Sequence, residues 1–365
     1  HVNNSWDIRG ALESRRTGYD GGIILLNLTG HDEVLPDNDA WLNASRYGAL
    51  SAVEGLPMMF YGQEQGIQNY NPTPGFEYND GFLTAHESNF GKFIPNFKQW
   101  NKLLVWEFPP PNSTGMADWY GNVNRARLNS PALRSPNRWF LTRTAASGGG
   151  DLGNLFAVAK YDQPAVGPQG GADVVLAFSL LLPHGGPHGT AAGTYDLRGA
   201  GDVLWTQLGL HTGRDYIARN LASSSPAAIL PGWPRSGQSL YDDGVYVSVQ
   251  GDNAQPITTD GALVQYLKLD AVPALVISDV ERAGATVRVE IPVETGWRYT
   301  ILFSDDFRSL GATASWQPFV AQGVYAHTGA AATHTFIDDF TVATSGAAFP
   351  AHGYRAYRVY AEPTP

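Results

Sequence analysis

Two short apolar runs separated by one helix constrain the fold of this chain more than any other feature. The first run, Ile23–Leu26, is followed by His31-Asp32, and the second run, Pro57–Tyr61, is followed by Gln63-Glu64. Between the two runs, Asp39–Glu54 has an acidic start and an apolar spacing that favour a helix. Strand, helix and strand form a βαβ unit, and such units build parallel sheets that carry chemistry after the C-terminal ends of their strands. The sequence therefore predicts that both polar pairs lie at one edge of a parallel sheet.

These motifs resemble the last two β/α units of the α-amylase superfamily barrel. In that family the seventh strand ends in a His-Asp pair and the eighth reads like LPMMFYGQE, which matches His31, Asp32 and Leu56–Glu64. Further along, Gly121–Arg134 resembles the family's final barrel helix with its R-x-N-S-P-A-L-R ending. The three matches occur in the family's order and cover about the first third of the chain.

The resemblance implies a mixed fold class, α/β plus all-β. We expect the C-terminal part of a (β/α)8 TIM barrel at residues 1–135, an antiparallel β-sandwich at 136–251 and a small C-terminal β-module at 260–365. Short strand-like runs between Gly, Ser and Pro segments after Pro131 favour the two β domains. The last module is similar to small β-modules of some secreted bacterial proteins, so we expect a secreted or periplasmic protein.

A barrel of this kind has eight β/α units, and only about the last two are expected in this chain. In the resembled family the nucleophile is an Asp after the fourth strand and the general acid is a Glu after the fifth, and both units would precede this chain. We therefore expect the N-terminal segment of the same protein to complete the barrel, and the chain alone to be inactive.

Asp32 is the first candidate for a catalytic role. The resemblance implies that its carboxylate hydrogen-bonds the sugar hydroxyls next to the reacting carbon, and that His31 donates a hydrogen bond to the same sugar. A fixed carboxylate opposite the positive charge that develops on the sugar ring lowers the barrier. The structural alternatives are a capping Asp and a structural His. Glu33 should point away from Asp32, because neighbours on a strand face opposite sides, and Glu64 is expected to support the scaffold.

The polar segment at residues 65–90 is expected on the face where substrate would lie. Tyr70, Phe76 and Tyr78 are candidates for stacking on sugar rings, and packing of this segment onto the barrel is the equal alternative. The net charge of -10 argues against nucleic acid as a partner, and no apolar run has the length of a transmembrane span. The expected partner is an α-glucan oligosaccharide or polysaccharide.

Three histidines raise the question of a metal site. His184 and His188 lie in the loop sequence PHGGPH, whose flexible spacing does not hold two imidazoles together, and neither they nor His211 have a carboxylate or Cys beside them. Solvated loop histidines are therefore favoured, and the sequence identifies no cofactor in this chain. Calcium is often bound in the resembled family, and we expect any such site to use upstream residues.

Three functions remain open. The first is the C-terminal part of an α-glucan-acting glycoside hydrolase of the α-amylase type, which cleaves α-glucosidic bonds with retention. The second is an α-glucan branching or transglycosylating enzyme, because Glu33-Val34 after the His-Asp pair is closer to the branching-enzyme version. A separate departure from the family pattern is Gly30, which stands where the family usually has Asn. The third is a non-catalytic carbohydrate-binding fragment.

Overall fold

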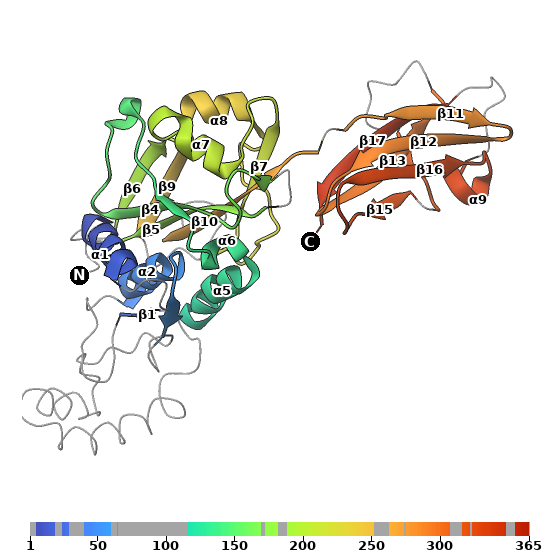
Figure 1. Ribbon diagram of the computed structural model, residues 1–365. Helices are drawn as coiled ribbons and strands as arrows, with labels where there is room; N and C mark the ends of the chain where they lie inside the picture. Colours follow the sequence, from blue (N-terminus) through green and yellow to red (C-terminus); the bar gives the residue numbers. More distant parts are fainter. Residues whose placement is uncertain are drawn as a thin grey trace, which may run out of the picture. The chain divides into compact units, whose positions relative to one another are not determined.

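The computed structural model describes most of the chain in two compact units, His1–Ala271 and Val272–Pro365 (Figure 1). The described residues are 5–18, 24–28, 40–59, 64, 115–168, 172–181, 188–251, 263–273, 275–306, 316–321, 323–347 and 355–364. None of the helices within these ranges has the length and apolar character needed to cross a membrane.

The first unit combines a helical layer with a large antiparallel sheet. Its helices are α1 (Ser5–Gly18), α2 (Ala40–Ser51), α5 (Met116–Asn129), α6 (Pro131–Arg134), α7 (Val203–Leu208) and α8 (Gly237–Asp243), with 3-10 turns η2 (Ala145–Ser147) and η4 (Ala200–Asp202). Its strands are β1 (Leu25–Asn27), β2 (Leu56–Met58), β3 (Arg138–Phe140), β4 (Leu155–Tyr161), β5 (Val174–Leu180), β6 (His188–Tyr195), β7 (Asp215–Asn220), β8 (Arg235–Ser236), β9 (Val245–Gly251) and β10 (Val264–Ala271).

The large sheet has the strand order β3-β4-β5-β10-β7-β8, and all its neighbouring strands are antiparallel. Every residue of β4 and β5 is buried. Helices α1, α2, α5 and α6 lie on one side of these strands, and β6, β9, α7 and α8 lie on the other (Figure 1). The ring centroids of Phe178 on β5 and Tyr195 on β6 are 5.0 Å apart, which joins the sheet to the β6–β9 pair. Coverage of both faces explains why these antiparallel strands read as continuous apolar runs rather than alternating ones.

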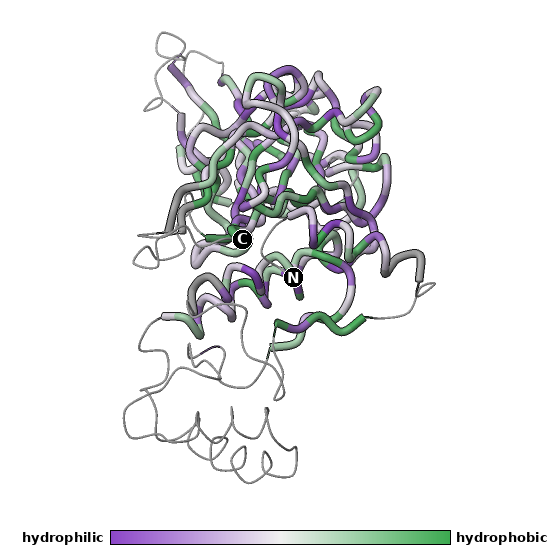
Figure 2. The backbone as a smooth tube through the Cα atoms, turned by 90° about the vertical axis from the view of Figure 1, so that its left-hand side faces the viewer, coloured by the Kyte–Doolittle hydropathy of each residue, from purple (hydrophilic) through white to green (hydrophobic). Residues whose placement is uncertain are grey.

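The predicted fold class is confirmed in the described residues. Strands β1 and β2 pair in parallel with helix α2 between them in sequence, and antiparallel sheets follow. Figure 2 shows hydrophobic segments alternating with hydrophilic ones along the chain, and the buried core residues come from many short segments. The barrel–sandwich boundary at about residue 135 stays a prediction.

One boundary differs from the expected division. The small module was expected to begin at residue 260, whereas β10 pairs with both β5 and β7 inside the large sheet. The second compact unit therefore begins at Val272. The difference arises because β10 follows a polar segment in sequence but completes a sheet whose other strands are far earlier in the chain.

Helix α2 packs directly on the large sheet through small residues. The Ser45 hydroxyl lies 2.6 Å from the carbonyl oxygen of Leu180 and 3.1 Å from that of Leu263. One turn later, the Gly48 carbonyl accepts a hydrogen bond from the hydroxyl of Tyr266, which is fully buried on β10. Burial raises the pKa of the Tyr266 hydroxyl, so it stays a neutral donor. The Ser45 hydroxyl thus ties the helix to carbonyls beside two strands, and the Tyr266 hydroxyl ties β10 to a carbonyl of the helix.

Gly48→Ala should lower the free energy of unfolding by about 1–3 kcal/mol, because an added methyl group overpacks the core. A Cβ atom at this position would overlap a methyl group of Val264 and lie 3.3 Å from the Ser179 hydroxyl. Gly10→Ala on α1 is the matched control, since a Cβ there meets nothing within 4 Å and alanine is the better helix former. Urea unfolding followed by circular dichroism measures both, and a Gly48→Ala variant as stable as the parent would show that the contact tolerates a larger residue.

The second unit is a sandwich of two antiparallel sheets. Its strands are β11 (Asp279–Ala283), β12 (Thr286–Val293), β13 (Trp297–Ser304), β14 (Gln317–Pro318), β15 (Val324–Ala326), β16 (Ala332–Asp338) and β17 (Ala356–Pro363), with one helical turn, α9 (Val342–Ser345). Strands β11, β12 and β16 form one sheet, and β13 pairs with β14, β15 and β17 in the other.

Contacts between the inner faces of these sheets close the core of the second unit. The rings of Tyr325 on β15 and His334 on β16 stack with centroids 3.6 Å apart. The fully buried Asp338 accepts hydrogen bonds from Arg355 at 3.0 Å and from Tyr357 at 2.9 Å. A buried carboxylate needs such partners to offset its loss of hydration, so this group fixes how the two sheets pack.

Candidate functional site

The candidate site is the C-terminal edge of the parallel β1–β2 pair. The register joins Leu25 to Leu56 and Asn27 to Met58, so the chain leaves both strands at the same edge. One face of the pair is covered, because Leu26 is 2% exposed and α2 contacts both strands. The opposite face is open, with Leu25 60%, Leu56 53% and Met58 41% exposed. Within the described part of the chain these two strands pair only with each other, so this sheet has both an uncovered apolar face and free edges.

The residues predicted to act on substrate follow these strands but lie outside the described residues. They are His31, Asp32, Tyr70, Phe76 and Tyr78. Their roles stay predictions, and the structure contributes the frame from which they extend. Glu64, expected to support the scaffold, is described and is half-buried in a short 3-10 segment.

Within the described residues, the histidines considered as metal ligands (His184, His188 and His211) are not seen together at one site. His184 lies outside the described residues, and so does the side chain of His188. The backbone amide of His211 donates to the Tyr216 hydroxyl at 2.8 Å. Among the described residues there is no group of three or more His, Asp or Glu side chains that could hold a metal ion.

A buried arginine holds the connection from α2 to β2. Arg127 on α5 donates to the carbonyl oxygens of Ser51, Val53 and Leu133, each at 2.8 Å, and to that of Gly55 at 2.6 Å. Burial lowers the pKa of the Arg127 guanidinium, which nonetheless stays charged at neutral pH. Carbonyls at the C-terminal end of a helix lack helical partners and carry partial negative charge. One guanidinium therefore satisfies the end of α2 and positions the start of β2.

The segment Arg127–Arg134, which resembles the family's helix ending, has a structural explanation. Ser130 ends α5 and begins α6, where its hydroxyl accepts from the Leu133 amide at 3.3 Å. The same hydroxyl donates to the carboxylate of Asp173, which also accepts from the Ala132 amide at 3.2 Å. Asp173 immediately precedes β5, so the motif fastens the last helices of the helical layer to the sheet.

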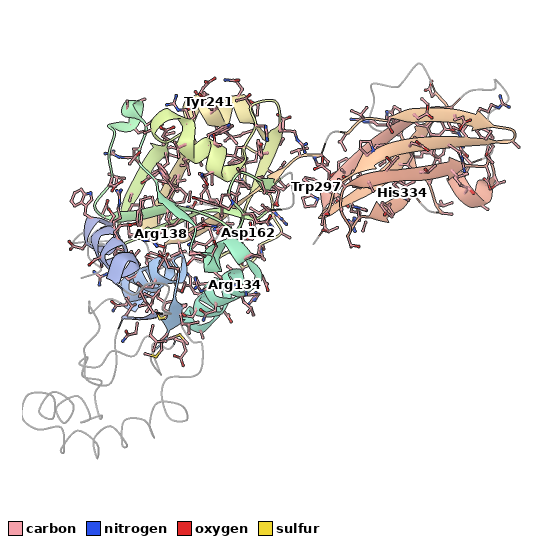
Figure 3. All side chains as sticks on the ribbon, viewed as in Figure 1. Arg134, Arg138, Asp162, Tyr241, Trp297 and His334 are labelled. Atoms are coloured by element: carbon pink, nitrogen blue, oxygen red, sulfur yellow. The ribbon has the colours of Figure 1, made fainter. Side chains whose placement is uncertain are left out.

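A second group of charges lies just before β2. Glu54, two residues before β2, pairs with Arg138 on β3 and lies 3.9 Å from the amine of Lys160 on β4. The two basic side chains are at most 1% exposed, and Lys160 also donates to the Ser135 carbonyl at 2.6 Å. Figure 3 shows Arg138 where α1 meets the sheet, and Glu13 of α1 accepts from it at 3.0 Å.

Sequence reasoning missed these framework residues. The available signal was a lysine inside the apolar run LFAVAKY, since a lysine is almost never fully buried unless it is paired. The four acceptors of Arg127 are backbone carbonyls, which every residue type provides, so the sequence does not mark them. The described residues thus hold the connection that leads into β2, and they do not include the predicted reacting groups.

Comparison with known proteins finds similarity to solved structures alone. No protein-family model matches the chain, and no curated protein matches it. The α-amylase of Geobacillus thermoleovorans complexed with acarbose is 12% identical with a TM-score of 0.42, and the match covers 73% of this chain and 44% of that chain. The trehalose-6-phosphate hydrolase of Bacillus licheniformis is 12% identical with a TM-score of 0.37, and the match covers 72% of this chain and 46% of that chain.

A trehalulose synthase, MutB, is 14% identical with a TM-score of 0.38, and the match covers 73% of this chain and 47% of that chain. The chain thus spans less than half the length of each of these solved structures. The resemblance to α-amylase-type enzymes that the motifs predict is therefore found among solved structures as well. At these TM-scores the similarity carries no inference about activity, and the function proposed for this chain rests on its own residues.

Proposed function

We propose that this chain is the C-terminal part of an α-glucan-acting glycoside hydrolase of the α-amylase type. The observation that carries the proposal is the parallel register of β1 and β2, two strands that the sequence continues into His31-Asp32 and Gln63-Glu64. Groups that follow parallel strands share one edge of the sheet, which is where barrels of this kind place their chemistry. Arg127 and the Glu54 group hold the start of β2, so they fix the direction in which this strand runs toward that edge.

In this proposal Asp32 stabilises the transition state. Cleavage of an α-glucosidic bond with retention develops positive charge on the sugar ring, and the Asp32 carboxylate opposes that charge while hydrogen-bonding the adjacent hydroxyls. His31 donates a further hydrogen bond, and Tyr70, Phe76 and Tyr78 provide faces for sugar rings. The nucleophile and the general acid come from the N-terminal segment of the same protein, and any calcium would be held there too.

The open face of the β1–β2 pair supports the need for an upstream segment. Leu25, Leu56 and Met58 expose large apolar side chains on a two-stranded parallel sheet. Purely parallel sheets are normally covered on both faces. Further strands from the N-terminal segment would bury these side chains inside a closed barrel.

The decisive experiment compares the chain alone with the same chain fused to its upstream segment. We expect the fused polypeptide to release reducing ends from soluble starch and the 365-residue chain alone to release none. Turnover by the chain alone would contradict the proposal. Inactivity of the fused polypeptide would favour the non-catalytic alternative.

Product analysis separates hydrolysis from transfer. On linear amylose, a hydrolase produces shorter chains with new reducing ends. A branching enzyme produces new branch points with no net gain of reducing ends. The second outcome would replace hydrolysis by the transglycosylating alternative that Glu33-Val34 keeps open.

A further inference from the structure

A cluster of aromatic rings and two histidines lies where β15 of one sheet meets β16 of the other in the second unit. The ring of Tyr325 stacks on that of His334, with centroids 3.6 Å apart and an angle of 8° between the ring planes. Phe336, on the same side of β16, contacts His334 edge to face, with centroids 4.7 Å apart. The half-buried imidazole of His334 therefore touches one aromatic ring face-on and another edge-on.

The second histidine of the cluster, His327, is held by hydrogen bonds and is 8% exposed. Its Nε2 lies 2.6 Å from the carbonyl oxygen of Ala330, and its Nδ1 lies 3.1 Å from the Tyr325 hydroxyl. A carbonyl oxygen only accepts, so Nε2 carries the proton and Nδ1 of the neutral ring accepts from the tyrosine. Tyr325 thus contacts both histidines, one through its hydroxyl and the other through the face of its ring.

The ring of His334 has a different environment, because no hydrogen bond reaches it from the described residues. A proton added to this ring would place a charge beside two aromatic rings without an acceptor to offset its loss of hydration. Burial lowers the pKa of the His334 imidazole, and the neighbouring His327 lowers this pKa further. The packing of β15 on β16 therefore matches the neutral form of His334.

The charged groups on the neighbouring strands are engaged elsewhere. Asp338, the inward carboxylate of β16, accepts from Arg355 and from Tyr357 on β17. On β13, the partner of Tyr325 is Tyr299, whose hydroxyl accepts from the backbone amide that follows β12 at 2.8 Å. That amide belongs to Glu294, and the inner residues of β12 itself are apolar: Val287, Val289, Ile291 and Val293.

We propose that the Tyr325–His334–His327 cluster is a pH-sensitive contact that keeps β15 on β16 at neutral pH and releases it in mild acid. When both imidazoles carry a proton, two positive charges lie in one partly buried cluster, and their repulsion opposes the packing. The inference rests on the second unit alone and is independent of the proposed function.

The direction of the pH effect follows from the lowered pKa of His334. Above the ordinary histidine pKa of 6.5 the ring is neutral in the folded and in the unfolded chain, and the contact is fully stable. Below that value the unfolded chain binds the proton more readily than the folded one, so stability falls as the pH falls. The loss is complete once the pH has passed below the folded pKa.

The test is hydrogen exchange of the 365-residue chain, followed by mass spectrometry. The two conditions are about pH 7.5 and about pH 5, on either side of the ordinary histidine pKa, with correction for the intrinsic pH dependence of amide exchange. Residues 324–338 should exchange about fivefold faster at the lower pH, a change that corresponds to about 1 kcal/mol. Residues 174–180 of β5, in the first unit, should keep their protection.

Two variants make the result specific. His334→Phe keeps a ring beside Tyr325 and removes the group that titrates, so exchange of 324–338 should no longer depend on pH. His211→Gln is the matched control, because His211 is exposed in the first unit and makes its hydrogen bonds through its backbone. This variant should keep the pH dependence of the parent. Melting curves at neutral pH confirm that both variants are folded.

NMR of the chain with isotopic labels at the histidine Cε1 positions gives a second measurement. The signal that disappears in His334→Phe should titrate below the ordinary pKa, over the pH range in which exchange changes. An equal pH response in the parent and in His334→Phe would overturn the proposal, and so would a titration of His334 at or above the ordinary pKa. Acceleration of exchange in both units together would also overturn it, because the cause would then be general unfolding in acid.

Discussion

Arg127→Met should lower the free energy of unfolding of the first unit by about 4 kcal/mol, because several buried carbonyl groups lose their partner and each costs about 1–3 kcal/mol unsatisfied. The side chain of methionine fills part of the space but donates nothing. The carbonyls of Ser51, Val53 and Gly55 connect α2 to β2, so the loss should concentrate in that connection. Hydrogen exchange followed by mass spectrometry should show faster exchange in 40–58 and unchanged exchange in 286–304.

Two variants on the same helix make this result specific. Arg125→Met removes an exposed arginine two residues away and should change stability by less than about 0.5 kcal/mol. Arg127→Lys keeps the charge but replaces the planar fork by a single ammonium, so its stability should fall between the parent and Arg127→Met. If Arg127→Met proved as stable as Arg125→Met, the four carbonyl contacts would not hold the frame.

Asp32→Asn should lower kcat/KM on a soluble α-glucan by about 100- to 1,000-fold in the fused polypeptide, of the order found when one electrostatic group is removed from a catalytic site. Asparagine keeps the shape and removes the charge, and that charge matters most in the transition state. Substrate affinity should change much less. His31→Ala should have a milder effect, because a neutral donor contributes less than a charge.

The same substitution separates catalysis from helix capping. Asparagine caps helices about as well as aspartate, so a capping Asp32 would tolerate the change in both stability and turnover. Glu33→Gln is the control, since that neighbouring carboxylate is expected to point away from the substrate. Near-normal turnover of Asp32→Asn would remove Asp32 from the site, and a lowered melting temperature in Asp32→Ala with normal turnover would identify it as a cap.

Local patterns in the sequence predicted the elements of this fold well. The helix expected at Asp39–Glu54 is α2, Ala40–Ser51, which ends three residues before the predicted end. Strands β4 and β5 coincide with apolar runs that are visible in the sequence. Such features depend on neighbours in the chain, which is the information that periodicity contains.

Local sequence patterns did not predict which strands, or which side chains, pair with partners far away in the chain. The membership of β10 in the large sheet depends on β5 and β7, and no local pattern specifies a partner strand. Three of the four acceptors of Arg127, and Asp173 as the partner of Ser130, are also far away in sequence. For the candidate site, the motifs predicted which residues follow the strands, and the structure adds the groups that hold those strands in place.

The anchoring of α2 by Ser45 has a consequence for synthesis on the ribosome. The two carbonyl oxygens beside its hydroxyl belong to residues 135 and 218 positions later in the chain. At translation rates of about 5–20 residues per second, the helix emerges roughly 10–40 s before the strand that completes its binding surface. β5, which supplies the first of these carbonyls, is made well before β10, so α2 can pack on β5 while one partner of the Ser45 hydroxyl is still missing. The full set of hydrogen bonds that anchor α2 therefore forms only when β10, the last strand of the first unit, is available.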